Sequence, residues 1–100
     1  MYIIVLITAA HKKEAQEIAA LLLKHRLAAC VNIVENITSM FWWEGKIDRG
    51  KEALLLVKSK KEKFNRIVKA VKSLHSYQVP EVLALPIAAG EKKYLRWLDE

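Results

Sequence analysis

The sequence predicts an α+β protein, and two observations lead to this prediction. Apolar, β-branched runs alternate with segments whose apolar residues recur at helical spacing. In the middle of the chain, two long strand-like segments follow each other closely, which indicates a β-hairpin. The resulting order, β-α-β-β-α-β-α, is the ferredoxin-like split βαβ arrangement (βαββαβ) with a C-terminal helix added. Because 100 residues is the size of one domain, residues 1–100 are expected to form a single unit.

The first part of the chain predicts a strand, a helix and a second strand. Tyr2–Thr8 is a continuous apolar and β-branched run, as expected of a strand covered on both faces. A helix follows over about Lys12–Arg26, with an apolar stripe of Ala15, Ile18, Ala19 and Leu22. Ala28–Val34 is the second strand, and Asn36 is expected at a bend or bulge just after it.

The middle of the chain predicts a long hairpin and then the clearest helix. The hairpin arms are about Thr38–Ile47 and Lys51–Ser59, and "DRG" (Asp48–Gly50) is expected to form the turn. Ser59 and Glu62 have the spacing of a capping box at the start of the next helix. The apolar stripe of that helix consists of Phe64, Ile67, Val68, Val71 and Leu74.

The last part predicts a strand between two prolines and a short helix. Residues 76–80 end the second helix, and "EVLALPI" is a strand bracketed by Pro80 and Pro86. Prolines at these positions place the strand near an edge of the sheet. Gly90 interrupts the chain, and Lys92–Glu100 is the final helix.

Composition narrows the class of protein. The net charge is +6, but the basic residues lie mostly in "HKK", "KSKKEK" and "KAVK", which favour a solvated helix face over a nucleic-acid patch. The N-terminal apolar run is too short to span a bilayer and has no basic segment before it. The single cysteine, Cys30, excludes an intrachain disulfide and fits a reducing compartment. We therefore expect a cytoplasmic protein with neither nucleic acid nor membrane as a partner.

The predicted sheet has more apolar surface than its helices can cover. Right-handed crossovers place both main helices on one face of the sheet. Yet "YIIVLI", "LLLV" and "VLALPI" are apolar at consecutive positions, so the other face is apolar as well. Soluble monomers rarely expose such a patch. We therefore expect another subunit to cover this face, and the aromatic hairpin segment "MFWWEG" to extend a neighbour's sheet.

Polar and aromatic residues are predicted to gather at the end of the sheet where the first strand finishes. They are Thr8, Trp43, Glu44, Lys46, His75, Tyr77 and Glu81. Among them, His75 and Glu81 are a possible pair of ligands for Zn²⁺ or Cu²⁺. The alternative is structural: His75 caps the last carbonyls of the second helix, and Glu81 pairs with a lysine such as Lys46 or Lys58.

Cys30 is predicted to lie at the opposite end of the sheet from His75. It could join a metal site with His75 only across a subunit boundary, where a thiolate would favour copper further. The alternative for Cys30 is a small buried hydrophobic residue. Trp42 and Trp43 are expected to fill a core or an interface rather than to stack on a ligand.

No catalytic set is evident. No Ser or Cys nucleophile has an obvious base and orienting acid, and a chain with three glycines offers no Gly-rich phosphate loop. The segment "TAAHKK" also lacks the arginine that an acylphosphatase loop after the first strand would need. We therefore expect a protein that is not an enzyme and that holds no cofactor tightly.

Four segments of the chain, taken in order, resemble a known family. "RLAACVNI", "SMFWWEGKI", "EALLLVKS" and "HSYQVPEVLALPI", followed by a glycine and "YLRWL", are similar to the CutA divalent-cation tolerance family. The resemblance implies ferredoxin-like subunits in a tight homotrimer, with sheets facing inward and hairpins reaching to neighbours. It also implies a cytoplasmic protein that is linked to tolerance of copper and other divalent metals and binds Cu²⁺ weakly.

The family's proposed metal ligands have counterparts in this chain. Carried over residue by residue, they are Cys30, His75 and Glu81. The chain also departs from the family pattern. Ser76 follows the histidine where proline is usual, and Gln78 stands where glutamate is common. Ile7 occupies the end of the first strand, where some members carry a cysteine.

A second function stays open at this stage. The fold and trimeric symmetry also resemble the nitrogen-regulatory PII proteins, whose clefts between subunits hold small anionic ligands. Residues that could line such a cleft here are Trp43, Glu44, Lys46, Lys58 and Tyr77, together with Glu81. Fold alone does not choose between the two functions.

Overall fold

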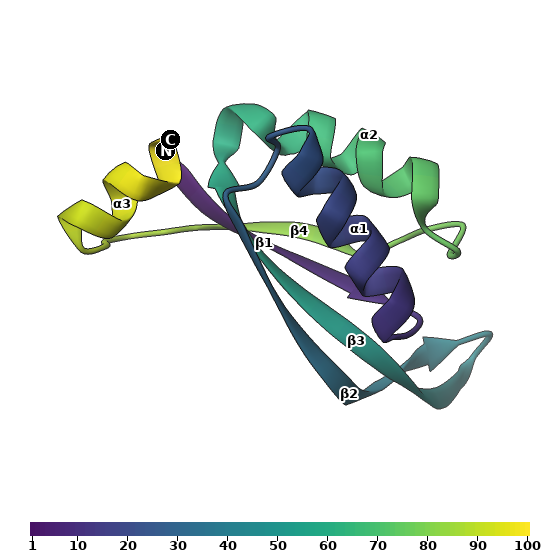
Figure 1. Ribbon diagram of the computed structural model, residues 1–100. Helices are drawn as coiled ribbons and strands as arrows, with labels where there is room; N and C mark the ends of the chain where they lie inside the picture. The colour runs from purple at the N-terminus through teal and green to yellow at the C-terminus, as the bar shows by residue number, and fades with distance from the viewer.

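The computed structural model describes all 100 residues and confirms the α+β fold and the predicted order of elements (Figure 1). The strands are β1 (Tyr2–Ala9), β2 (Cys30–Trp43), β3 (Lys46–Lys60) and β4 (Val82–Pro86). The helices are α1 (Lys12–Lys24), α2 (Phe64–Leu74) and α3 (Lys92–Asp99), and a short 3₁₀ turn, η1 (Lys61–Lys63), precedes α2. None of the helices is long and apolar enough to cross a membrane.

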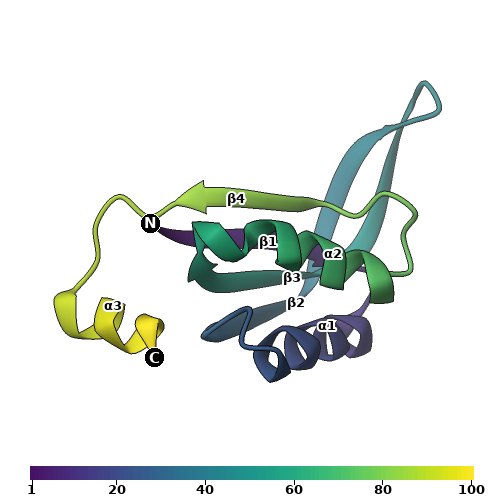
Figure 2. The ribbon, with the colours of Figure 1, turned by 90° about the horizontal axis from the view of Figure 1, so that it is seen from above.

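The strands form one antiparallel sheet in the order β2-β3-β1-β4. The N-terminal strand is therefore central: it pairs with β3 along its whole length, from Tyr2 opposite Lys60 to Ala9 opposite Ala53. α1 and α2 lie side by side on one face of this sheet (Figures 1 and 2). α3 lies apart from them, at the end of the sheet where the chain begins (Figure 2).

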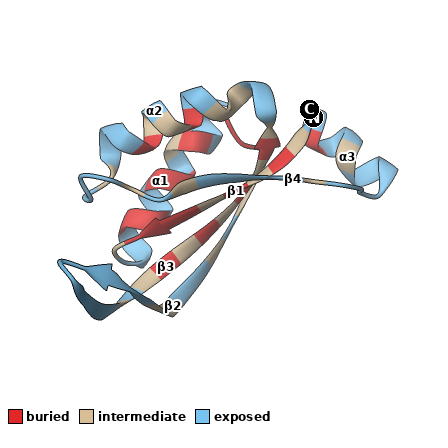
Figure 3. Cartoon of the chain, turned by 180° about the vertical axis from the view of Figure 1, so that it is seen from behind, coloured by how far each residue is buried: buried red, intermediate tan, exposed pale blue.

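The core forms between the sheet and these two helices (Figure 3). Alternate residues of the central strands point to the helices and are buried, as the two-residue period of a strand requires. The largest fully buried side chains are Ile7, Ile18, Leu22, Leu55, Ile67, Val5, Val57 and Val71. Every one of them comes from β1, β3, α1 or α2, so these four elements hold the fold together.

The opposite face of the sheet is apolar too, and neither α1 nor α2 covers it. We call it the open sheet face; its apolar residues are Ile4, Leu6, Val34, Leu54, Leu56, Leu83 and Leu85. The outer residues remain well exposed, with Leu83 at 56% and Leu85 at 49%. The sequence-based prediction that both faces of the sheet are apolar is thus confirmed for the single chain.

β2 and β3 continue past the end of β1 as a projecting hairpin, whose tip stands clear of the body in Figure 2. Its turn is Glu44–Gly45, so the prediction that Asp48–Gly50 makes the turn is wrong. Glu44 and Gly45 have φ angles of 49° and 78°. A two-residue hairpin turn of type I′ needs positive φ at both central residues, which glycine adopts without strain. Asp48–Gly50 instead lies inside β3.

The bulge expected at Asn36 is confirmed. The β2–β3 register shifts between Val34 and Ile37, and Asn36 has a φ angle of 56°. Asparagine is one of the few residues that tolerate this left-handed conformation. The bulge separates the part of β2 that lies over the body from the part that forms the projecting hairpin.

The predicted capping box at Ser59 and Glu62 is wrong. Ser59 still belongs to β3, faces the core, and donates its hydroxyl to the carbonyl of Leu27 at 2.5 Å. α2 begins only after η1, with Lys63 at the N-cap position and no side-chain cap. The Ser59 hydroxyl is therefore buried in a bond to the Leu27 carbonyl and does not cap α2.

Candidate functional site

His75 is the C-cap residue of α2, and its ring is fully buried. The Nε2 atom lies 2.6 Å from the carbonyl oxygen of Thr8, at the end of β1. The Nδ1 atom accepts a hydrogen bond from the backbone N–H of Tyr77 at 3.0 Å. Each ring nitrogen thus has a partner within the chain, Nε2 at the end of β1 and Nδ1 in the segment after α2. The ring therefore links β1 to the segment after α2.

This geometry differs from the predicted cap. The last turn of α2 is closed by the backbone N–H of His75, which donates to the carbonyl of Val71 at 2.8 Å. The imidazole itself contacts β1 instead of the helix carbonyls. Both ring nitrogens are thus engaged within the chain, and a metal ion at either nitrogen would have to displace one of these hydrogen bonds.

Glu14 is the second buried member of this region, and sequence reasoning missed it. It stands in the first turn of α1, where its backbone N–H donates to Nδ1 of His11 at 3.1 Å and so caps the helix. Its carboxylate accepts two hydrogen bonds from Ser76, one from the backbone N–H at 2.9 Å and one from the hydroxyl at 2.8 Å. Nδ1 of His75 lies 3.2 Å from the same carboxylate.

The carboxylate of Glu14 stays ionised because its partners outweigh its burial. Burial alone raises the pKa of a carboxyl group, but the donors on Ser76, the neighbouring His75 and the N–H of Ala10 together lower the pKa of Glu14 below its usual value. A signal for this role is present in the sequence. Glu14 precedes Ile18 and Leu22 at helical spacing, so it lies on the buried stripe of α1.

Removal of this carboxylate is expected to destabilise the fold. Glu14→Ala leaves the Ser76 donors without their acceptor and should lower the free energy of unfolding by about 2–3 kcal/mol near neutral pH. Because folding lowers the pKa of Glu14, its contribution is present above the ordinary value of 4.5 and is lost as pH falls through the lowered folded pKa. Urea unfolding at pH 7 and at pH 3 to 4 measures both effects, and Glu17→Ala, exposed on the same helix, is the control. Equal effects of the two variants at pH 7 would contradict the assignment.

Tyr77 extends this region to the base of the hairpin. Its hydroxyl donates to Oε2 of Glu52 at 2.7 Å, and its ring lies 4.6 Å from that of His75, centroid to centroid. Burial, followed by the hydrogen bond to Glu52, raises the pKa of Tyr77 to about 12. Tyr77 thus ties the segment after α2 to β3 at the point where the hairpin leaves the body.

Glu81 lies in the same connection between α2 and β4, and its side chain is exposed. The predicted pairing with Lys46 or Lys58 is not formed, since the amine of Lys58 donates to Asn32 and no ion pair involves Glu81. The chain contains no cluster of three or more His, Cys, Asp or Glu side chains arranged to hold a metal ion. Any metal bound near His75 and Glu81 would need a further donor from water or from a second chain.

Cys30 opens β2 at the other end of the sheet, as the topology predicted. It pairs in register with Lys58, which in turn pairs with Ile4, whereas Thr8 beside His75 pairs with Leu54. The thiol is partly exposed and adjoins Tyr94 of α3. Burial and then the neighbouring Cys30 raise the pKa of Tyr94. Cys30 and His75 are therefore well separated within one chain.

The ligand-cleft candidates do not come together within one chain. Trp43, Glu44 and Lys46 lie at the tip of the hairpin, beyond Ala53, where the pairing of β3 with β1 ends. Lys58 belongs to the opposite end of the sheet, beside Cys30, so only Tyr77 of this set adjoins His75. The hairpin-tip residues therefore lie beyond the predicted end of the sheet, but the long arms carry them outward and away from His75.

Fold and site together define a small ferredoxin-like protein with an uncovered apolar sheet face, a projecting aromatic hairpin and a buried histidine–glutamate link. A family profile described as "CutA1 divalent ion tolerance protein" matches residues 3–100. The chain belongs to this family.

Relatives from distant organisms share both the sequence and the fold. A divalent-cation tolerance protein CutA from Thermus thermophilus is 48% identical over 97 residues, covering 97% of this chain and 94% of that protein. Its solved structure superposes with a TM-score of 0.96 over 98% of this chain and 95% of the other. The solved structure of the periplasmic divalent cation tolerance protein CutA from Archaeoglobus fulgidus is 46% identical in sequence and superposes with a TM-score of 0.96, covering 99% of this chain and 96% of the other. The solved structure of CutA1 from Oryza sativa is 43% identical in sequence and superposes with a TM-score of 0.95, covering 98% of this chain and 90% of the other.

Proposed function

We propose that the protein is a non-enzymatic homotrimer of the divalent-cation tolerance type, which acts in the cytoplasm and binds Cu²⁺ weakly. The open sheet face is the observation that carries the proposal. It presents large apolar side chains that neither α1 nor α2 covers, and soluble proteins rarely leave such a patch in water. Assembly through this face would also bring donor atoms from different chains together, which a single chain does not do.

The proposed metal ligands are His75 and Glu81, with Cys30 as a further donor. An imidazole nitrogen, a carboxylate and a thiol are a donor set that suits Cu²⁺ or Zn²⁺. The exposed carboxylate of Glu81 and the partly exposed thiol of Cys30 are accessible. His75 must first give up its bond to Thr8 or to the N–H of Tyr77. This competition supports weak rather than tight binding.

Replacement of both principal ligands is expected to abolish Cu²⁺ binding. Calorimetric titration of Cu²⁺ into the assembled protein should give a saturable signal for the unmodified chain and none for His75→Ala combined with Glu81→Ala. The matched control is His25→Ala with Glu17→Ala, since both residues are exposed on or beside α1. Glu81→Gln alone should also weaken binding while the fold is kept, because the Glu81 side chain makes no hydrogen bond or ion pair. Unchanged titration of the double variant would end the ligand assignment.

A small-molecule-binding trimer of the PII-like kind is the alternative function. Within one chain, the residues proposed to line its cleft lie in three separate places: at the hairpin tip, next to Cys30, and next to His75. Such a cleft would therefore need residues from two chains. A thermal-shift screen that compares divalent metals with nucleotides and small acids separates the two functions. The compound that binds the folded protein raises its melting temperature, and the increase grows with the concentration of that compound.

A further inference from the structure

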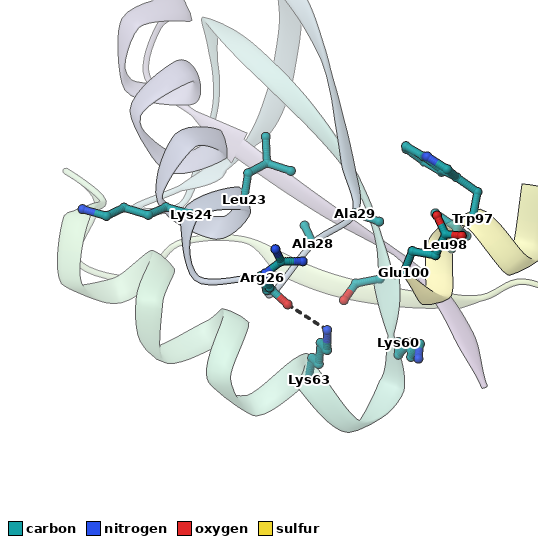
Figure 4. Close-up of a pocket in the computed structure, with 11 residues that line it drawn as sticks. Leu23, Lys24, Arg26, Ala28, Ala29, Lys60, Lys63, Trp97, Leu98 and Glu100 are labelled. Carbon is teal, nitrogen blue, oxygen red and sulfur yellow. Dashed lines mark hydrogen bonds between the residues drawn. The ribbon is translucent and has the colours of Figure 1, made fainter.

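A positively charged pocket of about 410 Å³ lies where α1, η1 and α3 meet, at the end of the sheet remote from His75 (Figure 4). Its floor is formed by buried or half-buried residues, among them Ala28, Ser59 and Leu98. Its rim carries the cationic side chains Lys24, Arg26, Lys60 and Lys63. Pockets of about 300–1,000 Å³ are the size that holds small-molecule ligands in proteins.

The charges of this pocket are poorly balanced within the chain. The lysine ion pairs of the chain join Lys12 to Glu35 and Lys60 to Asp99. Lys24, Arg26 and Lys63 therefore have no carboxylate within 4.0 Å. Glu100 is the one acidic residue of the lining. An anion in the pocket would meet Arg26 and Lys63, which no acid neutralises.

Arg26 directly follows the C-cap residue of α1 and lines the pocket. Its φ angle is 55°, in the left-handed region that follows a helix end and is usually occupied by glycine or asparagine. This conformation belongs to the C-terminal cap of α1, in which the N–H of Arg26 donates to the carbonyl of Leu23 and the N–H of Leu27 to that of Leu22. The carbonyl oxygen of Arg26 accepts a hydrogen bond from Nζ of Lys63 at 2.7 Å, drawn as a dashed line in Figure 4. This bond holds the Lys63 amine beside the backbone of Arg26.

We propose that this pocket binds a phosphate-bearing small molecule, held by the Arg26 guanidinium and the Lys63 amine. A guanidinium presents a planar fork of N–H groups that matches two phosphate oxygens, and the lysine amine retains protons beyond the one it donates to Arg26. Leu23 and Trp97 supply apolar walls for the remainder of the ligand. The site uses none of the proposed metal ligands, so it stands apart from the proposed metal function.

Calorimetric titration with sodium pyrophosphate tests the proposal. The protein is used in its natural assembly, at constant ionic strength and with EDTA present, so that divalent metals play no part. Saturable binding of one pyrophosphate per chain is expected. Arg26→Gly should weaken this binding about tenfold or more. The melting temperature of Arg26→Gly without pyrophosphate should stay close to that of the parent, because glycine adopts a positive φ freely.

The matched control is Arg66→Gln, which removes the same charge from an exposed position of α2 outside the pocket. Its affinity should stay within about twofold of the parent, since distant surface charges are screened. The same comparison of affinities can be made with lysines, with Lys63→Gln as the test variant and the exposed Lys69→Gln as the control. Absence of saturable binding, or equal losses for Arg26→Gly and Arg66→Gln, would overturn the site. Citrate that binds as tightly as pyrophosphate through Arg26 would overturn the assignment to phosphate.

Discussion

A glutamate in place of Leu56 should leave the protein as single chains. Leu56 lies at the centre of the open sheet face, paired with Leu6 on one side and with Asn32 on the other. If another chain covers this face, the new carboxylate would have to be buried in an apolar interface without a partner. That burial costs several kcal/mol, on the order of the stability of a small protein interface. Analytical ultracentrifugation at micromolar concentration should show a trimer for the parent and a monomer for Leu56→Glu.

The control for this experiment adds the same charge where no contact is expected. Asn65→Glu lies on the exposed side of α2, and this variant should keep the mass of the parent assembly. A parent protein that already sediments as a monomer would remove the basis for assembly through the sheet. A Leu56→Glu variant that remains trimeric would show that the interface lies on another surface, such as the projecting hairpin.

The second large effect concerns the neighbouring residue, Leu55. Its side chain is fully buried and points to α1 and α2. Leu55→Ala should lower the free energy of unfolding by about 2–5 kcal/mol, because it removes apolar contacts and leaves a cavity. Urea denaturation measures this loss. The difference in unfolding free energy between variant and parent should be the same at every protein concentration at which both are in the same assembled state.

Leu56→Ala is the informative companion of this variant. Leu56 is only half-buried in the single chain and faces the other way. In an isolated chain this substitution would cost much less than Leu55→Ala. If a second chain covers the open sheet face, its cost should approach that of Leu55→Ala and should appear as a shift in the concentration dependence of unfolding. A small, concentration-independent loss would show that the face stays in water.

Most of the fold was predictable from local pattern. The buried run of β1, the apolar stripes of both main helices and the bulge at Asn36 depend on residues close in sequence, and each is confirmed. The hairpin turn was missed because "DRG" and "WEG" both carry turn residues, and only the pairing register of β2 with β3 decides between them. Ser59 was assigned to a cap because its distant partner, the carbonyl of Leu27, is not visible in a local window.

The candidate site was harder to predict than the fold. The sequence singled out His75, but its partner Glu14 comes from a different helix, 61 positions away by the residue numbers. Ser76 supplies a backbone donor to Glu14 that a proline at this position would lack. The hairpin-tip residues were placed beside His75 because topology gives the end of the sheet at which they lie but not how far the arms project.

The central position of β1 has a consequence for how the chain folds. β1 is synthesised before the other three strands but pairs only with β3 and β4, so its neighbours in the sheet are made long after it. Contacts between residues so far apart in sequence slow folding, and unpaired apolar strands in an incomplete chain promote aggregation. A nascent chain that stops before Val82 still lacks β4 and leaves one side of β1 open, so the sheet is completed only after residues 82–86 have been synthesised.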